Sequence, residues 1–164
     1  METSSIPASN WKFDHVGIVV RDMDEAIVYY QALGIGPFEI KHPGRPLPGS
    51  ARLGLSSDVE IKIRVADLSA IRLELIQPVK GESIHRKFFD AKGEGVDHVC
   101  FQVDDIDEET ENMIRKGFRV ILSGRNTQGG GGFTYFDTDQ VGGIKFELVQ
   151  WPQSVRHQDQ NESR

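Results

Sequence analysis

The sequence lacks most features of secreted and membrane-spanning proteins. Cys100 is the only cysteine among the 164 residues, so no disulfide forms within the chain, as is usual in a reducing compartment. No apolar run approaches the roughly 18 residues of a membrane span. Residues 1–10 have neither the basic nor the apolar segment of a signal peptide. We therefore expect a cytoplasmic protein with no membrane partner.

An excess of positive charge is missing too. The chain has 19 Lys and Arg against 25 Asp and Glu, which gives a net charge of −6. Because binding of nucleic acid needs a basic surface, nucleic acid is not an expected partner. A hydrophobic fraction of 38% in a chain of this length is enough for one domain with its own core.

What the chain does have is an internal repeat. Residues 13–20 and 96–103 both read as strands, and they match at an offset of 83 residues. The shared feature is the sequence Asp-His-Val at residues 14–16 and 97–99. A repeat of this length predicts two copies of one structural module.

A helix follows the first strand of each copy. Asp22 and Asp105 each precede a helical pattern and have a Glu three residues later, as in a capping box. Gly34 and Gly117 end the two patterns and suit left-handed C-caps. The apolar residues predicted to be buried are Met23, Ala26, Ile27, Tyr30 and Leu33 in the first helix and Ile106, Met113 and Ile114 in the second.

Strands complete each half. They are expected at residues 59–65, 70–77, 119–122, 133–136 and 145–150. The Pro/Gly-rich loop 42–49 accounts for the greater length of the first half. Each half reads β-α-β-β-β, and chance similarity does not explain the preserved order of elements. We predict an α+β fold in which two tandem βαβββ modules form a cupped, barrel-like mixed sheet.

The expected domain organisation follows from the repeat. One domain spans residues 11–152, with a linker that suggests a short helix through Ile84, Phe88 and Phe89. The expected ranges are 11–78 for module one, 79–94 for the linker, 95–152 for module two, and 1–10 and 153–164 for disordered tails.

Four side chains are expected to meet inside the cup. Strict alternation along the first strands puts Phe13 on the face of His15 and Val96 on the face of His98. Each strand glutamate lies between two large apolar residues, which pushes its carboxylate to the inner face. The symmetry of the repeat then gathers one candidate metal site: His15, Glu74, His98 and Glu147.

This set of residues suits one divalent metal ion, whether Zn, Ni, Co, Mn or Fe. The alternative is that the histidines are core residues and the glutamates face solvent. The recurrence of the same pair of residue types in both halves favours the metal.

The sequence resembles the vicinal oxygen chelate superfamily, which includes glyoxalase I, methylmalonyl-CoA epimerase, extradiol dioxygenases and antibiotic-resistance proteins. The resemblance covers about residues 12–152 and is carried by segments 14–16, 72–75, 96–107 and 142–148. It implies a substrate bound to the metal through adjacent oxygens, and it implies a homodimer.

Within the superfamily the chain is similar to methylmalonyl-CoA epimerases, through Gly142–Leu148 and Val103–Asp107. This similarity implies a metal-dependent epimerase or isomerase that moves an α-proton of an acyl-CoA or related carbonyl compound through an enolate. Glu147 and Glu60 are the candidate catalytic bases. Glu60 is alternatively an exposed strand residue, because Lys62 and Arg64 share its face.

Other functions stay open. Epimerases often have Gln at the position of Glu74, and Glu there is similar to glyoxalase I, a lyase that acts on a thiol hemithioacetal. A non-catalytic drug-binding protein needs no metal, and a dioxygenase site has one carboxylate rather than two. Arg64, Arg72 and Arg125 are candidates for binding an anionic group, and Cys100 is expected to be a buried, inert thiol.

Overall fold

The computed structural model describes residues 10–40, 59–69, 71–125 and 130–152. The predicted loop 42–49 and the predicted tails, apart from residue 10, lie outside these ranges. Within the described ranges, no helix is long and apolar enough to cross a membrane.

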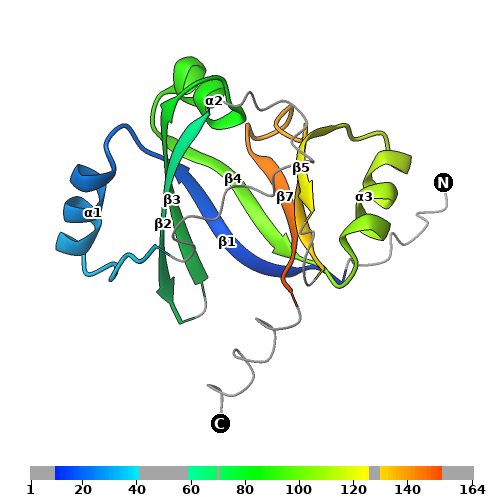
Figure 1. Ribbon diagram of the computed structural model, residues 1–164, viewed down its shortest axis with the longest axis horizontal. Coiled ribbons are helices and arrows are strands. Elements are labelled where there is room, and N and C mark those ends of the chain that lie inside the picture. The colour runs from blue at the N-terminus through cyan, green and yellow to red at the C-terminus, as the bar shows by residue number, and fades with distance from the viewer. Residues whose placement is uncertain (1–9, 41–58, 70, 126–129, 153–164) are drawn as a thin grey trace, which may run out of the picture.

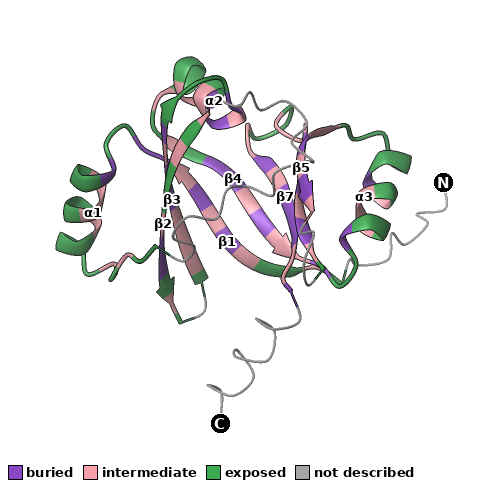
Figure 2. Ribbon diagram, viewed as in Figure 1, coloured by how far each residue is buried: buried purple, intermediate pink, exposed green. Residues whose placement is uncertain are grey.

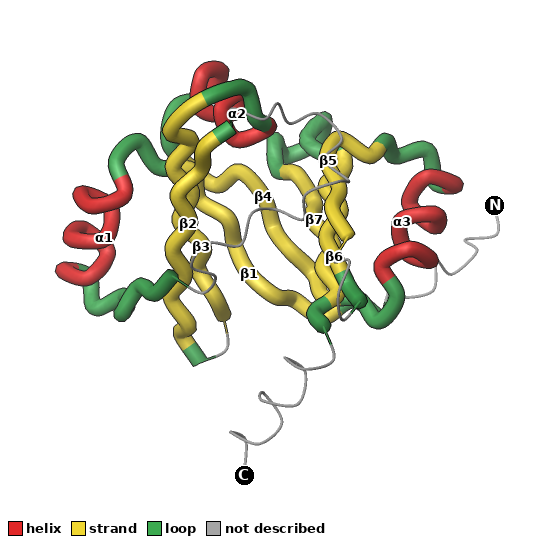
Figure 3. Tube along the Cα trace, in the orientation of Figure 1, coloured by secondary structure: helices red, strands yellow, loops and turns green. Residues whose placement is uncertain are grey.

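The described strands form one curved mixed sheet (Figures 1 and 3). They are β1 Lys12–Val19, β2 Glu60–Leu68, β3 Ile71–Lys80, β4 Gly95–Gln102, β5 Val120–Arg125, β6 Gly132–Phe136 and β7 Lys145–Gln150. Their order is β2-β3-β1-β4-β7-β6-β5. The central strands β1 and β4 are antiparallel, and each has a parallel outer neighbour, β3 or β7. This symmetry about the β1–β4 contact confirms the predicted fold of two related modules.

Three helices join the described strands: α1 Met23–Ala32, α2 Ile84–Lys92 and α3 Ile106–Arg115. The predicted caps are confirmed, because the Asp22 and Asp105 side chains accept hydrogen bonds from backbone amides in the first turns of α1 and α3. Gly34 and Gly117 follow the helix ends with positive φ angles of 83° and 93°. Figure 1 shows α1 and α3 beyond opposite ends of the sheet, with α2 between them.

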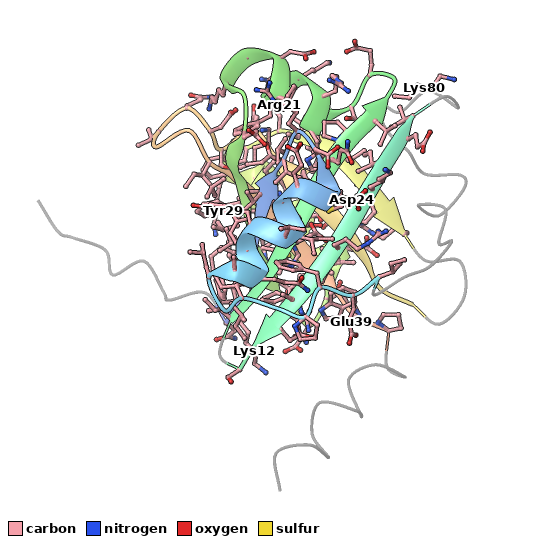
Figure 4. The ribbon with its side chains drawn as sticks, turned by 90° about the vertical axis from the view of Figure 1, so that its left-hand side faces the viewer. Lys12, Arg21, Asp24, Tyr29, Glu39 and Lys80 are labelled. Atoms are coloured by element: carbon pink, nitrogen blue, oxygen red, sulfur yellow. The ribbon has the colours of Figure 1, made fainter. Side chains whose placement is uncertain are left out.

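Module one has one strand fewer than predicted among the described residues. Where module two has β5, module one has only Glu39, which forms a two-hydrogen-bond bridge with Val65 of β2. Figure 4 shows Glu39 where the chain leaving α1 reaches the edge of the sheet.

The helices α1 and α3 cover the convex face of the sheet. Met23, Ala26, Ile27 and Tyr30 of α1 pack there, and so do Ile106 and Met113 of α3. Two predicted core residues are exposed instead, Leu33 by 60% and Ile114 by 53%. Leu33 lies beyond the last helical residue, and Ile114 is about 100° around the helix from the buried Met113. Figure 2 shows the resulting exposed outer sides of both helices.

Two β-bulges interrupt the central β1–β4 ladder. The pairing passes from Phe13 to His15 and from His98 to Val96, so Asp14 and Asp97 are each left without a partner on the opposite strand. The predicted shared faces are therefore wrong. Phe13 pairs with Phe101 on the convex side, and Val96 lies opposite the convex-side residue Ile18.

Candidate metal centre

The structure brings together the four residues predicted as ligands. His15 and His98 are on the antiparallel central strands, and Glu74 and Glu147 are on their parallel neighbours. Glu74 lies opposite Gly17, and Glu147 lies opposite Cys100. Each Glu is thus aligned with the residue two positions after a His, so all four side chains lie on the concave face. We call these four residues the His/Glu cluster.

Four side-chain atoms of the cluster converge. The Nε2 atom of His15 lies 3.5 Å from Glu74 Oε2 and 3.3 Å from Glu147 Oε2. The Nε2 atom of His98 lies 3.6 and 3.2 Å from the same two oxygens. The two Nε2 atoms are 3.2 Å apart.

These separations fit a metal ion. Donor atoms about 2.1 Å from a common ion lie about 3.0 to 3.4 Å apart in octahedral or tetrahedral geometry. Among the described residues, Glu147 Oε2 is the one fully buried side-chain N or O atom that has no hydrogen-bond partner. A buried carboxylate oxygen aimed at two imidazole nitrogens is stable only with a cation beside it.

The second nitrogen of each imidazole is also engaged. His15 Nδ1 lies 2.7 Å from Asp14 Oδ1, and His98 Nδ1 lies 3.3 Å from Asp97 Oδ2. With Nδ1–H donating to a carboxylate, the Nε2 lone pair points into the cluster, which is the usual arrangement of a metal-binding histidine. The two bulges make this possible, because each allows an Asp to lie beside the ring of the next residue.

The electrostatics of the cluster favour a bound cation. Burial lowers the pKa of His98, but the hydrogen bond with Asp97 and the negative charges of Glu147 and Glu74 raise it to about 9. Burial raises the pKa of Glu147, and the two histidines more than offset this and lower it. The pKa of Glu74 is lowered in the same way. The centre thus attracts positive charge, whether a proton or a metal ion.

Space at the centre depends on a glycine. A Cβ atom built on Gly17 would lie 1.9 Å from Cε1 of His98, which is fully buried. The equivalent position in module two is Cys100, opposite His15 in the ladder. Its thiol is buried as predicted, and burial, followed by the charge of Glu147, raises its pKa well above the ordinary value.

In module one, Asp14 is held from two sides. Arg72 Nη1 donates a hydrogen bond of 3.2 Å to Asp14 Oδ1, and Trp151 Nε1 donates one of 2.8 Å to Oδ2. The Arg72 side chain is 21% exposed and also binds Asp67. Arg72, one of the arginines singled out in the sequence, therefore supports the residue behind His15.

In module two, Asp97 has an equivalent but fully buried environment. Lys145 Nζ donates a hydrogen bond of 2.6 Å to Asp97 Oδ1, and His85 Nδ1 of α2 lies 2.9 Å from Oδ2. Lys145 corresponds to Arg72, because each precedes a cluster glutamate by two residues and pairs with the His of its own module. Burial raises the pKa of Asp97, but the hydrogen bonds with His85 and His98 lower it far below its usual range.

Sequence reasoning missed three residues around the cluster: His85, Lys145 and Tyr135. The matching Asp before each His was a usable signal for the residues behind the ligands, and so was the cation two positions before each Glu. Tyr135 had no such signal, because its place opposite Glu147 depends on the register between β6 and β7.

The structure does not bring Glu60 to the cluster. Val65 is the β2 residue opposite Glu74, and alternation from Val65 puts Ile61 and Ile63 on the concave face but Glu60 on the other. Glu60 is exposed and pairs with Lys80, which Figure 4 shows at the end of the sheet away from Glu39. Along β2 it lies roughly 17 Å from Val65.

The remaining arginines are not part of the cluster. Arg125 donates hydrogen bonds to Asp107 and to the Phe133 carbonyl, which ties β5 to α3 and β6. Arg64 donates to the carbonyl of its neighbour Ile63. Neither contact points to an anion-binding role.

Comparison with known families identifies the superfamily of this chain. Residues 14–136 match the model of the Glyoxalase/Bleomycin resistance protein/Dioxygenase superfamily. The chain belongs to this superfamily. The match includes three of the cluster residues, and Glu147 lies beyond its end. It confirms the resemblance to vicinal oxygen chelate proteins that the sequence predicted.

Individual proteins similar to this chain share about a quarter of its residues. The uncharacterized protein YqjC of Bacillus subtilis is 24% identical, over 90% of this chain and 97% of its own length. Methylmalonyl-CoA epimerase from Mycobacterium tuberculosis is 25% identical, with a TM-score of 0.63 over 89% of this chain and 91% of that one. A Streptomyces coelicolor methylmalonyl-CoA epimerase variant in complex with 2-nitronate-propionyl-CoA is 27% identical, with a TM-score of 0.58 over 85% of this chain and 96% of that one.

Proposed function

We propose that the protein is a metal-dependent epimerase or isomerase that moves an α-proton of an acyl-CoA or related carbonyl substrate. The observation that carries this proposal is that the His15 and His98 Nε2 atoms lie 3.2 Å apart on the concave face, each within 3.6 Å of one oxygen of Glu74 and one of Glu147. The 25–27% identity to methylmalonyl-CoA epimerases supports the acyl-CoA substrate class.

The proposed ligands of one divalent metal ion are His15, Glu74, His98 and Glu147. When bound, the ion supplies a Lewis acid that lowers the pKa of protons next to a coordinated carbonyl. The chain's own part is to orient both imidazoles through Asp14 and Asp97 and to keep the carboxylates ionised.

Glu147 is the proposed base. Its side chain is 9% exposed, its Oε2 has no hydrogen-bond partner among the described residues, and its ionised form is favoured by both histidines. A carboxylate in this state accepts the α-proton from a carbon held next to it and returns it to the same face, while inversion takes its proton from water on the opposite face. The geometry gives no support to Glu60 as a second base.

A glyoxalase-like lyase is the second candidate, and Glu74 is the observation that favours it. The sequence resemblance associates Gln with epimerases and Glu with glyoxalase I at this position. Glu74 lies within 3.6 Å of both imidazole nitrogens, so its charge is part of the cluster. A binding protein without catalytic activity is the third.

One experiment separates these functions. Purified protein is loaded with Zn, Ni, Co, Mn or Fe, and bound metal is measured by elemental analysis. NMR in D₂O then follows α-proton exchange of methylmalonyl-CoA and propionyl-CoA, and a parallel assay follows a hemithioacetal of glutathione. We expect about one ion per chain and exchange of a thioester α-proton. Turnover of the hemithioacetal alone would replace the epimerase with the lyase, and metal binding without turnover would favour a binding protein.

A pair of glutamine variants tests which carboxylate moves the proton. Glu147→Gln should weaken metal binding and slow α-proton exchange by about 10²-fold or more, the usual scale for a lost base. Glu60→Gln is the matched control and should retain the metal and the exchange rate, because Glu60 lies away from the cluster. A slow Glu60→Gln variant with full metal content would restore Glu60 as a base.

We also propose a homodimer, because the edge strands β2 and β5 each pair with one strand only among the described residues. Sedimentation at micromolar concentration should give twice the mass of the chain, and a monomer at that concentration would contradict the proposal.

A further inference from the structure

The hydroxyl of a tyrosine beside the His/Glu cluster has no evident role in holding the fold. Tyr135 of β6 lies directly opposite Glu147 of β7. Directly paired residues point to the same face of a sheet, so the phenol ring lies on the concave side. The ring meets that of His98 edge-on, with centroids 5.1 Å apart and an interplanar angle of 82°.

The hydroxyl of Tyr135 is nearly buried and is unpaired among the described residues. The residue is only 5% exposed. Its hydroxyl makes no hydrogen bond with the part of the chain that the structure describes. Glu147 Oε2 is the one fully buried side-chain N or O atom without a hydrogen-bond partner in that part. Because the Tyr135 oxygen also has no partner there, it is not fully buried.

Packing alone does not explain a hydroxyl at this position. The ring contacts the aromatic rings of His98, His85 and Phe133, and a phenylalanine would make the same contacts. Removing a hydroxyl from most of its water without a partner disfavours folding. At the equivalent position of module one, opposite Glu74, the chain has Val65.

The hydroxyl remains a donor at neutral pH. A phenol has an ordinary pKa of about 10, so it carries its proton at neutral pH and has a hydrogen to donate.

We propose that Tyr135 donates a hydrogen bond to an anionic oxygen of the substrate bound at the His/Glu cluster. This rests on the proposed function, in which negative charge develops on a substrate oxygen as the α-proton moves to Glu147. A fixed donor in a region with little water stabilises such charge strongly. With Val65 opposite Glu74, the described part of the site has a hydroxyl donor on the β6 side and the apolar side chain of Val65 on the β2 side. The preferred substrate therefore carries its oxygens toward β6 and a small hydrocarbon group toward β2.

The test compares Tyr135→Phe with Tyr30→Phe, a matched removal of a hydroxyl from α1 on the convex face. Each variant is measured for metal content, melting temperature, affinity of the metal-loaded protein for oxalate, and α-proton exchange of methylmalonyl-CoA. Oxalate is the probe of binding because it has adjacent anionic oxygens and needs no turnover.

We expect Tyr135→Phe to keep its metal and its melting temperature, because no hydrogen bond within the described fold is lost. Its oxalate affinity should fall about tenfold or more, the usual loss for a hydrogen bond to a charged group. Proton exchange should slow by about 10²-fold. Tyr30→Phe should match the wild type in ligand affinity and exchange.

The outcomes separate this inference from the proposed function. Unchanged oxalate affinity and exchange in Tyr135→Phe would refute the hydrogen bond and leave the epimerase standing. If the wild type exchanges no thioester proton but Tyr135→Phe still loses oxalate affinity, the epimerase falls and the donor stands. If the metal-loaded wild type binds no oxalate and exchanges no thioester proton, both fail. A lower melting temperature with unchanged oxalate affinity would make Tyr135 a structural residue.

Discussion

The two modules support equivalent histidines with the same arrangement but in different surroundings. In each, an Asp at a β-bulge binds the imidazole Nδ1 and pairs with a cation located two residues before a cluster Glu. Module two buries the whole arrangement, with side-chain exposures of 0% for Asp97 and 10% for Lys145. In module one Asp14 is 6% exposed, but Arg72 is 21% exposed and is shared with a second carboxylate.

The linker helix α2 is the source of this difference. His85 of α2 fills the third position around Asp97, and Phe88 of the same helix packs with Val19 and Ile76. One helix can cover only one of two symmetric sites. In module one that position is taken by Trp151, which follows the last strand. An internal symmetry of strands therefore does not make the two ligands equivalent, and we expect His98 to be held more rigidly than His15.

The largest expected effect on metal affinity comes from replacing the small residues at the centre. Gly17→Ala should reduce metal affinity by about 100-fold or more, because the new methyl group would displace the buried His98 ring. Cys100→Ala, at the equivalent position of module two, should leave the affinity near that of the wild type. Titration with Co²⁺, followed by absorbance, measures both. Equal affinities would mean that the His98 side is as adaptable as the His15 side.

The next effect concerns the two aspartates. Asp97→Ala should lower the free energy of unfolding of the metal-free protein by about 3–5 kcal/mol, because it leaves Lys145 buried without its carboxylate. Asp14→Ala should cost less, since Arg72 keeps Asp67 as a partner and is closer to solvent. Urea denaturation of both variants gives the values. A greater loss in Asp14→Ala would reverse the comparison.

The smallest effect concerns the third partner of each aspartate. His85→Leu should weaken metal binding by about 10- to 100-fold, as for other residues behind metal ligands. His85→Asn should restore part of this affinity, because its amide N–H replaces the Nδ1 donor. Trp151→Phe, the module-one counterpart, should weaken binding less. A chelator competition assay ranks the metal affinities of the three variants. Weaker metal binding by Trp151→Phe than by His85→Leu would show that burial does not decide the effect.

The sequence was sufficient to predict the elements that depend on periodicity. The repeat located both copies of the strand–helix unit. The apolar neighbours of Glu74 and Glu147 led to the correct prediction that both carboxylates face inward. The alternation rule failed at Phe13 and Val96, because a bulge adds one residue without a change in hydrophobic pattern.

Contacts between distant elements were beyond the sequence for another reason. His85 meets Asp97 only because α2 folds back over β4, and Glu60 faces away from Glu74 because of the β2–β3 register. Neither the docking of a helix nor the register of a ladder is encoded in a local pattern. The Asp-His pair in each copy was visible, but its meaning depended on the bulges.

The proposed ligands are divided between the two modules, which meet where β1 pairs with β4, and this division has a practical consequence. Each half of the chain carries one His and one Glu, so neither half alone has a full coordination shell. A chain cut before α2, near Gly81, would yield two fragments whose reunion creates the binding site. Uptake of Co²⁺ would then act as a colour signal for reassembly, and the protein would serve as a metal-reported split pair.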